Sequence, residues 1–199
     1  SHLNKFPDMG INAFMIATYL MVNEDRAKIF RRIALNEFKE FSAMLEASID
    51  EGVVYTIPGV LGETRPLIRH LLNTRRYLRK KGDKHRNVAS EMYKLYSFYD
   101  RIISAFESDY QNMVLTVPDT EKSGLLRIID DNSSGIDLSD VDKDLIAAGI
   151  HYARDMSRRD EKIVVVSRDG KLLECLRIVR TNNSNNPSVS QRCFGVYYR

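Results

Sequence analysis

The feature that most constrains this chain is the segment of residues 138–173, which combines an acidic helix start, an amphipathic helix and a buried strand. The strand, residues 163–167, reads IVVVS and is typical of a parallel sheet covered on both faces. Asp169 follows it almost directly. Because ligands of open α/β sheets bind outside the carboxyl ends of the strands, we expect Asp169 to lie at a ligand-binding edge.

The helix of this segment begins with two polar residues, Ser139 and Asp142, whose spacing before an apolar run predicts a capping box. Asp142 also lies seven residues before Gly149, a small residue that predicts close packing of the helix on the sheet. Asp142 is therefore a candidate both for a cap and for a metal ligand, with Asp144 and Asp140 as further acids. Asp169 is likewise either a ligand or only the N-cap of the last helix.

The rest of the chain alternates between strand-like and helix-like patterns. We expect strands at 12–22, 53–57, 113–117 and 194–198, helices at 24–52, 66–81, 86–106, 139–156 and 171–180, and a mobile surface loop at 119–137. Together with the strand at 163–167, this order predicts an α/β fold of three layers. Its central, mostly parallel sheet would carry helices on both faces.

Composition predicts a single domain over residues 5–199, with a helical, basic insertion at about 66–110. Residues 1–4 resemble a tag remnant and flexible N-terminus. No run approaches the roughly 18 apolar residues of a membrane span. Two cysteines, Cys175 and Cys193, are too few for a disulfide framework or a zinc cage. We therefore expect a soluble, cytoplasmic protein with no membrane partner.

The formal net charge of +3 conceals a strong asymmetry. Residues 65–86 contain nine Lys or Arg and one acid, whereas residues 119–144 contain eight acids and three bases. The basic segment could bind a polyanion beside a cation held by the acidic segment. Alternatively, both segments are simply solvated helix faces. The candidate RNA contacts are Arg65, Arg69, Arg75, Arg76, Arg79, Lys80, Lys81 and Arg168, and Tyr77 could stack on a base.

Other chemistries find little support in the sequence. It contains no Gly-rich phosphate loop, no H-E-x-x-H and no C-x-x-C. His70, His85 and His151 are better explained as surface or packing residues than as ligands. A cluster of carboxylates instead predicts a hard cation such as Mg²⁺, which prefers oxygen ligands and keeps several waters.

Four acidic positions in this order resemble the PIN-domain ribonucleases. In that family an Asp ends the first strand, a Glu follows the second strand, a third acid opens a helix after Leu-Ser, and a fourth follows a strand as Ser-x-Asp. The matching segments here are FMIATYLMV, VVYTIPGVLGE ending at Glu63, LSDVDKDL with Asp142, and VVVSRD ending at Asp169.

The resemblance implies a metal-dependent endoribonuclease. Glu63, Asp142 and Asp169, with Asp144 as a further ligand, would bind one or two Mg²⁺ or Mn²⁺ ions that activate water for attack on an RNA phosphodiester. It also implies a homodimer and, in the toxin branch of the family, an inhibitory antitoxin-like partner.

The chain departs from the family at the first acid, where Ala17 stands in place of the expected Asp. Asp8 cannot substitute, because nine residues of extended strand span about 30 Å. Either the protein is a naturally degenerate member, or an Asp→Ala change disables a toxic nuclease. In both cases we expect little or no activity with Ala17. The competing interpretation is a catalytically degenerate module that binds RNA or protein.

Overall fold

The computed structural model describes residues 55–80, 82, 86–154, 163–167 and 169–197. These residues fall into two compact units, residues 55–116 and residues from 117 onward. The predicted strand at 12–22, the helix at 24–52 and Ala17 lie outside the described residues. Each unit is treated separately below.

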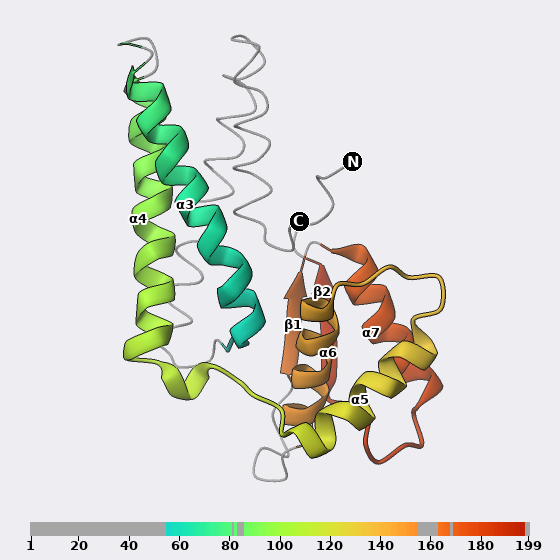
Figure 1. Ribbon diagram of the computed structural model, residues 1–199. Helices are drawn as coiled ribbons and strands as arrows, with labels where there is room; N and C mark the ends of the chain where they lie inside the picture. The colour runs from blue at the N-terminus through green and yellow to red at the C-terminus, as the bar shows by residue number, and fades with distance from the viewer. Residues whose placement is uncertain (1–54, 81, 83–85, 155–162, 168, 198–199) are drawn as a thin grey trace. The chain divides into compact units, whose positions relative to one another are not determined.

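The first unit is a helical hairpin of α3 (Pro58–Lys80) and α4 (Arg86–Ser108), shown in Figure 1. The helices run antiparallel, because Arg65 pairs with Glu107 while Arg75, ten residues later, contacts Tyr93 on an earlier turn of α4. The interior of the unit is apolar and contains Ile57, Ile68, Leu78, Ala89, Phe98, Tyr99, Ile103, Phe106, Met113 and Leu115. The predicted helix at 86–106 is confirmed with a slightly later end.

Helix α3 begins eight residues before the predicted start at position 66. Pro58 suits the first helical turn, since its fixed φ is helical and its missing N–H is not needed there. Pro66 then lies inside the helix, where a proline costs about 3 kcal/mol. The helix nevertheless continues, because Thr64 and Ile68 on either side of Pro66 are buried in the hairpin. Tertiary packing therefore outweighs the tendency of an internal proline to break the helix.

The described residues of the predicted strands at 53–57 and 113–117 form a single parallel bridge, between Thr56 and Val114. The amide of Thr56 donates to the carbonyl of Met113 at 3.0 Å, and the amide of Leu115 donates to the carbonyl of Thr56 at 2.7 Å. Met113 itself closes a short 3₁₀ helix, η3 (Gln111–Met113). The expected strand at 113–117 is thus too long, because a helical turn occupies its first residue.

The prediction of a mobile loop at 119–137 is wrong. Residues of this segment form α5 (Asp119–Asn132), which buries Leu125 and Ile129 completely or nearly so. The four-residue spacing of these side chains decides the structure, since it places both on one helix face. The helix tolerates Ser123, Gly124 and Asn132, and the chain leaves it through Ser133, Ser134 and Gly135, where Gly135 has a φ of +83°.

The second unit continues with α6 (Asp140–Ala153), β1 (Ile163–Ser167), α7 (Gly170–Asn182) and β2 (Cys193–Tyr197). The prediction for β1 is confirmed residue by residue, and those for α7 and β2 within two residues. Strands β1 and β2 pair in parallel, with Ile163 opposite Cys193 and Val165 opposite Gly195. The protein is thus of mixed α/β character, mostly helical, with a small parallel sheet.

Both α6 and α7 lie on the same face of this sheet. A Cβ on Gly149 of α6 would stand 3.0 Å from Sγ of Cys193 and 3.1 Å from Cγ2 of Val165. A Cβ on Gly195, the partner of Val165, would instead meet Leu173 of α7. Paired residues of a parallel ladder point to the same face, so both helices cover that face.

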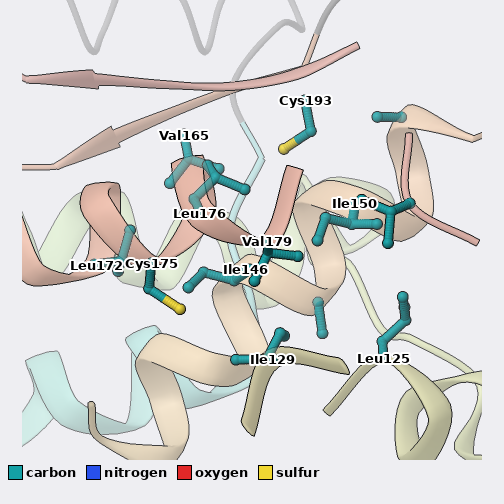
Figure 2. Packing of buried hydrophobic residues seen from close by; sticks show 13 residues of the cluster. Leu125, Ile129, Ile146, Ile150, Val165, Leu172, Cys175, Leu176, Val179 and Cys193 are labelled. Atoms are coloured by element: carbon teal, nitrogen blue, oxygen red, sulfur yellow. The ribbon is translucent and has the colours of Figure 1, made fainter. Parts of the chain in front are cut away.

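Helix α5 completes the buried cluster on this face of the sheet. Figure 2 shows Ile129 and Leu125 of α5 beneath the side chains that α6, α7 and the strands contribute. Cys175 and Cys193 are buried in the same cluster, and burial raises the pKa of the Cys193 thiol to about 12. Both cysteines are free thiols that pack in the interior of this unit.

The close approach at Gly149 yields a stability prediction. Gly149→Val should lower the free energy of unfolding by about 1–3 kcal/mol, because the added methyl groups would overlap Val165 and Cys193. The matched control is Gly124→Val in α5, where nothing lies within 4 Å of the new Cβ. That change should stay within about 0.5 kcal/mol. Urea denaturation measures both, and equal effects at the two glycines would contradict the packing described.

Candidate metal centre and nucleic-acid interface

The acidic start of α6 lies toward the carboxyl end of the parallel strands. Gly149, in the second half of α6, is near Ile163 and Cys193, the first residues of the two strands. The carbonyl of Ala153, the last residue of α6, accepts a hydrogen bond of 2.9 Å from Ser190, just before β2. The helix therefore runs antiparallel to the strands, as Figure 1 shows, and its N-terminus points to the edge where β1 ends.

Asp142 forms the predicted capping box with Ser139. The amide of Ser139 donates to Oδ2 of Asp142 at 3.0 Å, and the Ser139 hydroxyl donates to the same oxygen at 2.7 Å. In return, the amide of Asp142 donates to Oγ of Ser139 at 3.1 Å. Asp142 is buried, with 8% of its surface exposed. The cap therefore fixes the carboxylate at the helix start.

Asp169 is the N-cap of α7, one of the two roles expected for it. Its Oδ1 accepts hydrogen bonds from the amides of Lys171 at 2.8 Å and Leu172 at 3.4 Å. Its own amide donates to Oγ of Ser167, the buried last residue of β1, at 2.9 Å. These bonds place Asp169 immediately beyond the carboxyl end of β1.

The two helix starts thus bring Asp142 and Asp169 to the same edge of the β1–β2 pair. In each residue the cap bonds fall on one carboxylate oxygen, Oδ2 in Asp142 and Oδ1 in Asp169. The other oxygen of each makes no hydrogen bond to a described residue. Carboxylate oxygens are the ligands that a hard divalent cation prefers, and this sheet edge offers two of them.

Two other acids of this unit, Asp144 and Asp130, form ion pairs with lysines. Asp144, predicted as a further ligand, forms a half-buried ion pair of 2.8 Å with Lys122 of α5. Lys143 pairs with Asp130 at 2.7 Å, and this hydrogen bond raises the pKa of Lys143. Both pairs join α6 to α5. Asp144 therefore serves as a tether between helices in this structure.

Glu63 lies in the other unit, within α3 rather than in the turn expected after the second strand. Its side chain is half-buried. Ala17 lies outside the described residues. Among the described residues, no three His, Cys, Asp or Glu side chains gather in an arrangement that could hold a metal ion. Of the four positions that the resemblance implies, the described part of the chain places Asp142 and Asp169 toward the same edge of the strand pair.

The predicted RNA-contacting residues on α3 differ in their surroundings. Arg65 is paired with Glu107, and the guanidinium of Arg75 lies 4.1 Å above the ring of Tyr93. The others, Arg69, Arg76, Arg79 and Lys80, are exposed. Lys81 and Arg168 lie outside the described residues.

Tyr93 was not among the predicted site residues, yet it is 46% exposed and packs beside Tyr96. The sequence gives no clear sign of this exposure, because spacings of four residues from Ala89 and three from Tyr96 place Tyr93 beside the apolar stripe of α4. Only the packing of the two helices shows that its ring reaches the surface.

Comparisons of the chain with protein-family models, with curated proteins and with solved structures find no match. Among the described residues, no helix combines the length and apolar character needed to cross a membrane. The functional assignment therefore depends on the residues and geometry of this chain itself.

The cap geometry of Asp169 predicts how two substitutions at this position change the free energy of unfolding. Asp169→Ala should lower the free energy of unfolding by about 1 kcal/mol, because two amides of α7 lose their acceptor. Asp169→Asn should have a much smaller effect, since an amide oxygen also accepts these bonds. Thermal or urea denaturation of both variants checks this. A large loss of stability in Asp169→Asn would contradict a simple capping role.

Proposed function

We propose that this protein is a metal-dependent endoribonuclease whose site includes Asp142 and Asp169. The observation that carries the proposal is that two helices begin with an Asp at the carboxyl edge of one parallel strand pair. This edge is where open α/β sheets bind ligands. Parallel strands joined through a helix, β1–α7–β2, support the same interpretation.

The two carboxylates suit Mg²⁺ or Mn²⁺ but are too few to hold the ion alone. Each has one oxygen not used by its helix cap, and a Mg²⁺ ion bound through one or two carboxylates keeps several waters. The resemblance to PIN-domain ribonucleases, with their three-layer fold, implies Glu63 and an Asp at position 17 as the other two acids of the set. When bound, the ion would activate a water and stabilise the developing charge on the phosphate. The capping bonds would hold both carboxylates in position.

A second candidate is a catalytically degenerate RNA-binding module, favoured by the exposed arginines and lysine of α3. Both candidates bind RNA, and for either we propose a location in the cytoplasm. A homodimer and an inhibitory antitoxin-like partner belong to the nuclease candidate. The two candidates differ in what Ala17→Asp would do.

The test is cleavage of a labelled single-stranded RNA by the full chain in Mn²⁺, with and without Ala17→Asp. We expect the protein with Ala17 to be nearly inactive and Ala17→Asp to raise the cleavage rate by at least about 100-fold, of the order expected for one electrostatic group. Adding Asp142→Asn to Ala17→Asp should abolish that gain, since the amide keeps the cap but loses the charge. EDTA should abolish it as well.

The matched control is Asp137→Asn, an exposed acid of the same segment that caps no helix. It should leave cleavage by the Ala17→Asp protein unchanged. If Ala17→Asp binds Mn²⁺ no better than the protein with Ala17 and cleaves no RNA, the nuclease proposal is wrong. The RNA-binding module then takes its place.

A further inference from the structure

The α3–α4 hairpin combines positive charge with exposed aromatic rings. Among the residues whose side-chain exposure the structure describes, three large hydrophobic side chains are exposed, and two of them, Tyr77 at 57% and Tyr93 at 46%, lie on this hairpin. Tyr77 lies near the end of α3 and Tyr93 near the start of α4. Exposed aromatic rings are therefore concentrated where the sequence is most basic.

The charge on α3 follows one face of the helix. Arg65, Arg69, Arg76 and Lys80 are separated by four, seven and four residues, spacings that place them on a common stripe. Ile68 and Leu78 point into the hairpin instead. With a rise of 1.5 Å per residue, the stripe extends over about 22 Å. It thus forms a linear track of positive charge.

The stripe is most available at its turn-proximal end. Arg65 is paired with Glu107 at the other end, whereas Arg76 and Lys80 are exposed. Arg79 and Tyr77 are also exposed on the last turns of α3. The guanidinium of Arg75 in α3 lies over the ring of Tyr93 in α4, in a cation–π contact between the two helices. We call Arg76, Tyr77, Arg79, Lys80 and Tyr93 the hairpin tip.

We propose that the hairpin tip binds single-stranded RNA, with Arg76, Arg79 and Lys80 contacting phosphates and Tyr77 stacking on a base. A basic track with exposed aromatic side chains is the combination that proteins use for single strands, because unpaired bases expose their faces. An acidic protein partner would use the charge but would have no need for the rings. The aromatic residues therefore favour RNA. The inference does not rest on the metal site.

The test is fluorescence anisotropy of the full chain with a labelled oligouridylate, in EDTA so that no cleavage occurs. Tyr77→Leu should weaken binding about 5- to 150-fold, the range for loss of one stacked base, with the salt dependence unchanged. Arg76→Gln/Lys80→Gln should instead reduce the slope of log K against log salt by about 1.4, since each phosphate contact on a single strand contributes about 0.7.

The matched control is Arg127→Gln/Arg177→Gln, which removes the same charge from exposed positions of the other unit. It should leave the affinity and the slope unchanged. Duplex RNA should bind more weakly and be insensitive to Tyr77→Leu, because its bases are already stacked. Circular dichroism checks that each variant keeps its helices.

Two outcomes would overturn the proposal. One is an affinity for oligouridylate that Tyr77→Leu changes less than twofold. The other is competition by polyglutamate as effective as that by oligouridylate at equal charge, which would assign the tip to acidic proteins. Because no divalent ion is present, neither outcome depends on whether the carboxylates at the sheet edge bind a metal.

Discussion

The close packing of α6 on the β1–β2 pair is the contact on which the second unit depends. Gly149 permits it, because any side chain there would overlap Val165 and Cys193. The approach lets Ile146 and Ile150 of α6 become fully buried together with Leu172 and Leu176 of α7. Each such side chain contributes roughly 1.5–3 kcal/mol on burial. The same packing fixes where the first turn of α6 lies.

The position of the two aspartates follows from this packing and from their caps. Ser139 and Asp142 satisfy each other's amides, and Asp169 satisfies two amides of α7. A cap of this kind contributes about 1 kcal/mol and orders the side chain in advance. A carboxylate already held in one orientation loses less freedom on binding a cation than a mobile one does. Capping and metal binding are therefore compatible uses of the same residue.

The helical hairpin combines an apolar buried face with a charged exposed face. Burial of the apolar face stabilises α3 as one helix despite Pro66, whereas the exposed face carries several positive charges. Arginines and lysines spaced along one stripe repel one another, and an RNA strand would relieve that repulsion. Arg65 and Arg75 are already compensated, by Glu107 and by the ring of Tyr93. Of the stripe, Arg69, Arg76 and Lys80 are exposed, the last two on the final turns of α3.

The sequence by itself determined the local elements with strong patterns. The apolar run of β1, the capping pattern of Ser139 and Asp142 and the small residue at Gly149 are each recognisable from local sequence, and all three agree with the structure. It also identified the basic segment, because charge is a property of composition. Only the tertiary structure decided that 119–132 is helical and that α3 continues through Pro66. In both segments the local preference for a loop or a break is worth a few kcal/mol at most, and burial of distant side chains outweighs it. The sequence also identified Asp142 and Asp169 as candidate ligands, but placing both toward one edge of the strand pair required the direction of α6 against the strands, which no local pattern contains.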